Sequence, residues 1–338
     1  MFAYAVRRIF IGLAMLLVMT LITFLLFLNN TTAAVLTSCG KNCTPEQKVE
    51  IAKTLGYDQP VLVQWGKFVK GVVAGRQFPD DPGLRAKNPA IVTECPAPCL
   101  GYSFKSSSLV WDQMRDAMWV SVSIAAVAFT LWIIFGVLFG IIAALNKGKL
   151  VDKLIVGTTL VIFAFPTFFI GLLLYVFVAL RWGWVPIPNY IPIADGGVFN
   201  WLLGLLLPAI TLAVFYMAGY VRMTRAYILE TGSEDYIRTA KAKGLSARAV
   251  VGKHTMRAAL TPIVTMAGMD LALVLGGAPI TETVFNFNGL GKMAVEATLQ
   301  YDLPITLGIV VFLAAFVILA NIIVDIAYAF IDPRVRLD

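Results

Sequence analysis

Apolar residues occur in long continuous runs along this chain, separated by polar segments of very different length. A helix needs about 20 apolar residues to cross a bilayer. Six runs meet this length, at residues 9–28, 117–145, 154–180, 201–221, 262–280 and 305–330. Their apolar residues do not alternate with polar ones, as the strands of a membrane barrel would require. The pattern predicts an all-α membrane protein with six transmembrane helices.

The composition agrees with this prediction, because 59% of the residues are hydrophobic and only 14% are charged. Soluble domains carry about 25% charged residues. Arg7 and Arg8 precede the first apolar run as in a signal peptide, but no small-residue cleavage site follows it. We therefore expect this run to be a retained helix.

The distribution of lysine and arginine predicts the orientation of the chain in the membrane. Residues 222–261 carry eight of them, and the short segment after residue 145 carries three more, whereas the loops after residue 180 and before residue 305 carry one each. Basic loops stay on the cytoplasmic side. Both termini are therefore expected in the cytoplasm, and the net charge of +7 follows this asymmetry and does not indicate a nucleic-acid-binding domain.

The predicted organisation has three parts: the N-terminus and first helix (1–28), an extracytoplasmic segment (29–116), and a five-helix core (117–338) that contains the basic loop 222–261. In the outer segment, Thr44 and Gln47 form a capping box at the start of a short amphipathic helix. All four cysteines lie in this segment, in two C-x-x-x-C pairs. They are Cys39, Cys43, Cys95 and Cys99. Disulfides are expected on this oxidising side, with three possible connectivities, and a zinc site is the alternative.

The basic loop contains an ordered motif. It reads D-Y-I-R-T-A-K-A-K-G-L-S from Asp235, followed by H-T-M-R-A-A-L-T-P from His254. The alanines favour a helix, Gly244 is suited to end it, and Ser246 can cap a second helix. A loop of this polarity with two short helices is suited to bind a soluble partner.

This stretch resembles the EAA loop of ATP-binding-cassette importer permeases, in the form found in the dipeptide, oligopeptide and nickel family. The resemblance covers nearly the whole chain and includes L-G-Y-D-Q-P after the first run, T-E-T-V-F and G-L-G near residue 285, and D-P-R-V-R at the C-terminus. The segment around Cys95 and Cys99 departs from the family pattern as an insertion.

The resemblance implies a first-permease subunit of the bacterial inner membrane, which forms half of a pathway for short peptides by ATP-driven alternating access. Nickel chelates, other metallophores, haem and small glycans are compatible alternatives. The implied partners are a second permease, two ATPases or one fused pair, and an extracytoplasmic binding protein. The chain is expected to be non-catalytic, without a bound cofactor or metal, with ATP and Mg at the partner subunits. The loop residues implied in ATPase docking are Asp235, Tyr236, Arg238, Thr239, Ala240, Lys241, Lys243, Gly244, Leu245, Ser246 and Arg248.

Two acids lie inside the apolar runs, where a charge is costly and indicates a function or a partner. Asp325 matches a family position near Arg334 and Arg336, which favours a structural role. Asp270 either lines the pathway and attracts a cationic group, or accepts a hydrogen bond between helices.

Glycines indicate close packing and a broken helix in the core. Gly136 and Gly140 form G-x-x-x-G, which is typical of tightly packed helices. Gly276 and Gly277 interrupt the fifth run and are candidates for the pathway. The family resemblance assigns the segment that follows to closure of the outer mouth, and the outer-gate candidates in it are Glu282, Phe285, Phe287, Gly289, Leu290 and Gly291.

Two other classes of membrane protein are alternatives to the importer. A stand-alone solute channel would need polar residues on several helices, and the apolar runs offer two acids. A membrane-embedded hydrolase or transferase would need His, Ser or Asp clustered at one depth. Neither class explains the ordered loop.

Overall fold

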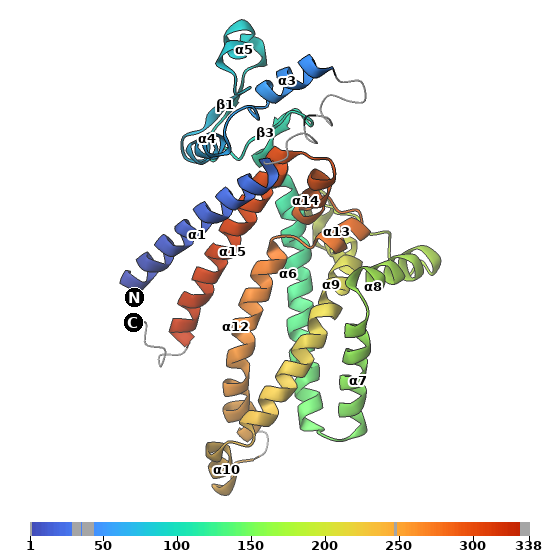
Figure 1. Ribbon diagram of the computed structural model, residues 1–338. Coiled ribbons are helices and arrows are strands. Elements are labelled where there is room, and N and C mark those ends of the chain that lie inside the picture. The colour runs from blue at the N-terminus through green and yellow to red at the C-terminus, as the bar shows by residue number, and fades with distance from the viewer. Residues whose placement is uncertain (1, 29–34, 36–43, 247–248, 332–338) are drawn as a thin grey trace. The chain divides into compact units, whose positions relative to one another are not determined.

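The computed structural model describes residues 2–28, 35, 44–246 and 249–331 of the chain (Figure 1). Within them, five helices are long and apolar enough to cross a membrane, or six if a bent pair counts as one span. The chain divides into two compact units, one of residues 1–119 with 289–338 and one of residues 120–288. The expectation of a largely helical membrane protein is confirmed.

The first unit is built around two antiparallel helices, α1 (Phe2–Leu28) and α15 (Leu303–Ile331), which lie side by side (Figure 1). A Cβ atom added at Gly12 of α1 would lie 2.7 Å from Ile318 Cγ2 of α15, so the two backbones approach closely there. Thr20 and Thr23 donate their hydroxyl hydrogens to carbonyls of α1 itself. Both polar side chains are thereby satisfied within a helix that offers its apolar surface to lipid.

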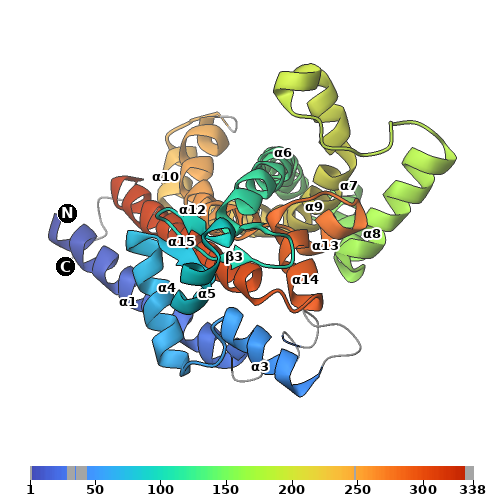
Figure 2. The same cartoon turned by 90° about the horizontal axis from the view of Figure 1, so that it is seen from above.

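The segment after α1 folds into short elements. These are α3 (Pro45–Thr54), α4 (Val61–Ala74), β1 (Arg76–Phe78), α5 (Pro82–Lys87), η1 (Pro89–Ile91), β2 (Thr93–Cys95), β3 (Tyr102–Ser103) and β4 (Ser108–Leu109). The capping box predicted at Thr44 and Gln47 is present at the start of α3. Figure 2 shows α4 against α1, where Trp65 Nε1 donates to Thr20 Oγ1 at 3.0 Å. Helix α4 is therefore packed into the first unit.

Cys95 and Cys99 form a disulfide with each other. This local pairing excludes the connectivities that would join them to the first cysteine pair, and it removes two of the four thiols that the zinc alternative needs. Cys39 and Cys43 lie outside the described residues. The bridged loop follows β2, which pairs antiparallel with β1 in the register Arg76 to Cys95.

A buried polar contact joins the β3–β4 hairpin to the turn between α14 (Leu290–Leu299) and α15. Ser103 Oγ donates to Asp302 Oδ2 at 2.5 Å, and both side chains are buried. Burial raises the pKa of the nearby Tyr57 phenol, and the negative charge of Asp302 raises it further, so this phenol stays neutral. The outer segment is thus fixed to the start of α15 by hydrogen bonds as well as by apolar packing.

The second unit holds the helices that carry the predicted core motifs. They are most of α6 (Val110–Leu145), α7 (Leu150–Ala164), α8 (Thr167–Leu173), the π-helical η2 (Leu174–Arg181), α9 (Ile193–Thr231), α10 (Asp235–Ala242), η3 (Val250–Thr255), α12 (Met256–Leu275) and α13 (Pro279–Val284). The core of this unit is formed by buried apolar residues of α6, α9 and α12 around Trp132 and Tyr220.

Helices α6 and α9 run in the same direction and pack closely through the G-x-x-x-G pair. A Cβ atom at Gly136 would lie 2.7 Å from Tyr220 Cβ, and one at Gly140 would lie 2.5 Å from Thr224 Cβ. The second contact lies four residues further along the chain on both helices, so the two helices are parallel. Helix α7 must therefore return the chain between them, and it packs along α9 (Figure 1). The predicted close packing at the G-x-x-x-G pair is confirmed.

Replacing Gly140 with alanine is expected to destabilise the protein by about 1–3 kcal/mol, because the added methyl group has no room against Thr224. The melting temperature of the purified protein in detergent measures this loss. Gly219→Ala on α9 is the matched control, since a Cβ atom there meets nothing within 4 Å. The control should melt at the wild-type temperature or slightly above it. Equal melting temperatures for the two variants would contradict the packing argument.

The third apolar run, predicted as one span over residues 154–180, is a bent pair of helices. α7 and the α8–η2 segment are bent by 100° at a break between Ala164 and Thr167. Pro166 causes the break because it has no N–H and forces the residue before it out of the helical region. Phe165 is accordingly extended, with φ −93° and ψ 139°.

The helices on either side of the basic loop are longer than the hydropathy pattern predicted. α9 continues to Thr231, and α12 begins at Met256, so the segment between them covers only residues 232–255. At its other end, α12 stops at Leu275, and Gly277 has φ 110°, a value that favours glycine. The predicted interruption of the fifth run at Gly276 and Gly277 is confirmed.

Candidate functional site

The candidate site is the segment that joins α9 to α12, residues 232–255, hereafter the α9–α12 loop. α10 covers the first part of its motif and ends in a Schellman arrangement, in which Leu245 N donates to Ala240 O at 3.4 Å. Gly244 takes the left-handed conformation that this ending requires, with φ 79°. The predicted helix end at Gly244 is therefore confirmed in its geometry.

The loop has a small core of its own. Ile237 and Ala240 on α10 pack with Val250 of η3, and all three are buried. Ser246 begins the second half, because its Oγ accepts from Ala249 N at 3.3 Å. This is the capping role predicted for Ser246. The described parts of the two halves therefore pack against each other.

The opposite face of α10 is exposed. The Tyr236 side chain is 48% exposed and Leu245 is 37% exposed, beside an exposed ion pair in which Arg238 Nη1 lies 3.4 Å from Asp235 Oδ1. Thr239, Lys243 and Gly244 share this exposure. The Lys241 side chain and the whole of Arg248 lie outside the described residues. A fixed surface with an aromatic, an aliphatic and charged groups is suited to bind a protein partner.

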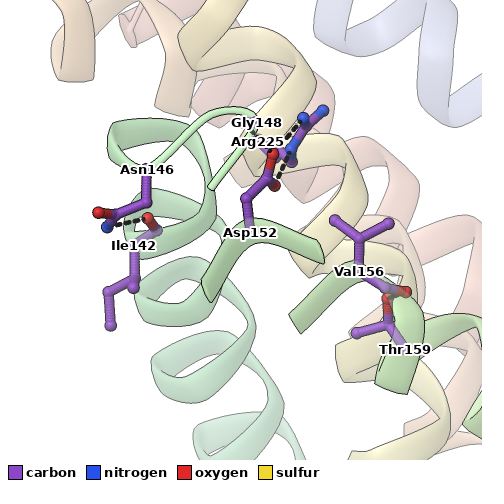
Figure 3. Close-up of polar contacts among 7 residues, drawn as sticks. All are labelled: Ile142, Asn146, Gly148, Asp152, Val156, Thr159 and Arg225. Atoms are coloured by element: carbon purple, nitrogen blue, oxygen red, sulfur yellow. Dashed lines mark hydrogen bonds and ion pairs between the residues drawn. The ribbon is translucent and has the colours of Figure 1, made fainter. Parts of the chain in front are cut away.

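A buried ion pair near the end of α9 lies close to the start of this loop. Arg225 donates to Asp152 from Nε at 2.6 Å and from Nη2 at 2.8 Å, and Gly148 N donates to Asp152 Oδ2 at 2.8 Å (Figure 3). Asp152 is only 4% exposed. The paired contacts hold the α6–α7 turn and the first turn of α7 to α9 in one geometry.

An apolar cluster joins the helices on the same side of the unit. Ala144 at the end of α6, Ile228 at the end of α9 and Ala259 at the start of α12 are buried together. The α9–α12 loop therefore begins and ends at this cluster of packed helix ends. The ends of α6, α9 and α12 are thus packed together, and the Asp152–Arg225 pair adds the start of α7 to this group.

Asp270 lies on α12 and faces α9. Its Oδ2 accepts a hydrogen bond of 2.6 Å from the hydroxyl of Tyr220, which supplies the interhelical contact that one of the two interpretations expected. The other intramembrane acid, Asp325, lies on α15, but its side chain is outside the described part of the chain, as are Arg334 and Arg336. Its predicted structural role stays a prediction.

The residues assigned to an outer gate are largely buried. Glu282 on α13 is fully buried, and its Oε1 accepts from Ser121 Oγ at 2.7 Å and from Ala278 N at 3.1 Å. Phe285 and Phe287 belong to the core of the second unit. Gly289, Leu290 and Gly291 are buried in the first unit, where they begin α14. Their assignment to a gate stays a prediction.

Sequence reasoning did not select the Asp152–Arg225 pair, Tyr220 or Ser121. A signal for the first was present, since Asp152 and Arg225 are opposite charges at the ends of two apolar runs. Tyr220 and Ser121 gave no signal, because hydroxyl groups are common in membrane helices and only the fold brings them to an acid. In the described part of the chain, no group of three or more His, Cys, Asp or Glu side chains is placed to hold a metal ion.

Two family models match nearly the whole chain. The model of the binding-protein-dependent transport system inner membrane component matches residues 136–337, and the model of the N-terminal region of the same component matches residues 1–125. The first of these matched segments contains the α9–α12 loop and the Asp152–Arg225 pair.

Curated relatives match over similar lengths. A peptide transport system permease protein of Brucella abortus is 32% identical over 338 residues, which is 100% of both chains. The dipeptide transport system permease protein DppB of Escherichia coli K12 is 30% identical over 318 residues, covering 88% of this chain and 87% of the relative.

Among solved structures, a chain of the inward-facing MetNI methionine ABC transporter aligns with a TM-score of 0.49 at 15% identity, covering 66% of this chain and 97% of that one. A chain of an amino acid ABC transporter aligns with a TM-score of 0.46 at 17% identity, covering 67% and 95%. The family assignment rests on the sequence matches and not on these superpositions. The chain belongs to the family of inner-membrane components of binding-protein-dependent transport systems, and it is a multi-pass membrane protein.

Proposed function

We propose that this chain is one of two permease subunits of an ABC importer and forms half of a translocation pathway for short peptides. The observation that carries the proposal is the α9–α12 loop, which has a buried core of its own, one exposed face, and a base where the ends of α6, α9 and α12 pack together. The relatives named as peptide and dipeptide permeases support the substrate class. Nickel chelates, other metallophores, haem and small glycans are the alternative substrates.

The proposed topology has six crossings with both termini in the cytoplasm. The bent pair α7 and α8–η2 makes one crossing, because α6 and α9 run in the same direction and the chain must return between them. α1 and α15 are antiparallel, which places the start of α1 and the end of α15 on one side (Figure 1). The lysines at 147, 149 and 153 and the basic α9–α12 loop assign their side to the cytoplasm. The segment between α1 and α6 then faces outward, where it would contact a binding protein.

ATP hydrolysis is assigned to partner subunits. Two ATPases that close on ATP change the equilibrium between inward-open and outward-open permeases only if they contact the two states differently. The α9–α12 loop supplies such a contact through the exposed face of α10. Its buried face and the Asp152–Arg225 pair convert a push on that loop into movement of whole helices, because the loop does not deform by itself.

The proposal is tested in vesicles that contain this chain, a second permease, the ATPases and the binding protein. Uptake of labelled Ala-Ala-Ala should require ATP on the side of the membrane that holds the ATPases. It should also require the binding protein on the opposite side. Uptake without ATP and without the binding protein would indicate a channel. ATP-dependent uptake of a nickel chelate, haem or a glycan, without uptake of the peptide, would support the importer function and contradict the proposed peptide substrate.

A further inference from the structure

Asp270 is an acid in a membrane helix whose charge is not balanced within the described part of the chain. Its one hydrogen bond, from Tyr220, reaches Oδ2, and the described residues supply neither a partner for Oδ1 nor an ion pair. The side chain is partly exposed and not sealed in the core. An intramembrane acid is costly unless a partner compensates it, so the missing cation points to a ligand.

Aromatic residues of α9 lie on the side of the helix that faces this carboxylate. Tyr216 lies one turn before Tyr220 on α9, and Trp132 of α6 stacks on Tyr216 with ring centroids 4.6 Å apart. Trp132 and Tyr220 are 0% and 2% exposed, which fixes their rings, whereas Tyr216 is only partly buried. The faces of aromatic rings attract cations, and they do so more strongly away from water.

An apolar groove of about 660 Å³ runs along α6 and α12 in the same unit. Its lining includes Phe129 of α6 and Gly268 of α12. These two residues lie within one helical turn of Trp132 and Asp270 along their own helices. Asp270 itself does not line the groove, but Ala267, which lies one turn before it on α12, does.

We propose that Asp270 and the aromatic ring of Tyr216, held in place by the buried Trp132 behind it, form a binding site for an ammonium group of the transported molecule. Tyr220 is the positioning residue, because its hydroxyl occupies Oδ2 and leaves Oδ1 for an incoming N–H donor. The inference rests on the proposed function, since every peptide with a free N-terminus carries such a group. The site would bind the cation while the apolar side chains of the peptide contact the groove.

The test compares uptake of Ala-Ala-Ala by wild type, Asp270→Asn, Asp270→Glu and Tyr220→Phe in the reconstituted importer. Asparagine keeps an acceptor for Tyr220 and removes only the charge, so uptake should fall about tenfold or more, while Asp270→Glu retains most of it. Tyr220→Phe keeps the charge and should lose less than Asp270→Asn. Asp116→Asn makes the same change in net charge on an exposed turn of α6 and serves as the control.

A structural hydrogen bond without a binding site predicts the reverse order. Asp270→Asn would then transport within twofold of wild type, and Tyr220→Phe would show the larger loss. That result would overturn the proposal.

A second measurement does not depend on a transported peptide, so it separates failure of the site from failure of the proposed substrate class. Met266→Cys places a thiol one turn from Asp270 on the same face of α12. With Cys39 and Cys43 replaced by serine, the rates of a cationic and an anionic methanethiosulfonate reagent are compared. The cationic reagent should react about tenfold faster than the anionic one, and Asp270→Asn should abolish this difference in rate. An unchanged ratio of rates would overturn the site even if peptide uptake is observed.

Discussion

Asp152→Ala is expected to lower the free energy of unfolding by about 3 kcal/mol and to uncouple ATP hydrolysis from transport. Removing one member of a buried ion pair leaves the other charge without compensation, and such losses are about 3–5 kcal/mol. We expect the lower end, because the Arg225 side chain remains 28% exposed. The α6–α7 turn also loses its contact at Gly148 N, so the first turn of α7 loses its polar link to α9. The measurements are the melting temperature in detergent and the peptide taken up per ATP hydrolysed.

Three variants separate charge, geometry and exposure. Arg225→Lys keeps the charge but loses the two-point contact, so its loss should be intermediate. Asp152→Asn combined with Arg225→Gln removes both charges and should recover part of the stability. Asp235→Ala breaks the exposed pair with Arg238 and should cost at most about 1 kcal/mol. An Asp152→Ala protein that melts with the wild type would show that the pair does not hold α7 to α9.

The helical class was predictable because the length of an apolar run follows directly from bilayer thickness. The end of α10 at Gly244 and the cap at Ser246 were predictable for a different reason: both depend on residues within one turn of each other. The same is true of the Thr44 cap. The break at Pro166 was also encoded locally, but counting apolar residues over a long window concealed it.

The contacts that complete the site were not predictable, because they join residues far apart in the chain. Tyr220 and Asp270 are separated by 50 positions, and Asp152 and Arg225 by 73. A pattern along one helix indicates which face of that helix is polar. It does not identify the residue of another helix that contacts this face across the core. The burial of Glu282 shows the same limit, since its contact with Ser121 joins residues 161 positions apart.

Gly244→Pro is expected to abolish transport while the protein remains in the membrane. Proline fixes φ near −65°, whereas Gly244 has φ 79°, so the Schellman end of α10 cannot form. The change lies in an exposed turn, where a Cβ atom would meet nothing within 4 Å, and the helices on either side keep their packing. We expect the amount of protein in the membrane to stay near wild type. Substrate-stimulated ATP hydrolysis and uptake should both fall more than tenfold, measured on the reconstituted importer.

Gly244→Asn distinguishes a conformational requirement from a steric one. Asparagine tolerates the left-handed region, so the loop keeps its shape and only gains a side chain on its exposed surface. If the ATPase contacts that surface closely, Gly244→Asn should lose ATPase binding even though α10 is intact. Gly183→Asn is the matched control, with φ 62° and the same open space in the segment after η2. Normal ATP hydrolysis and uptake in both Gly244 variants would contradict a docking role for the α9–α12 loop, because neither its shape nor its surface would then matter to the partner.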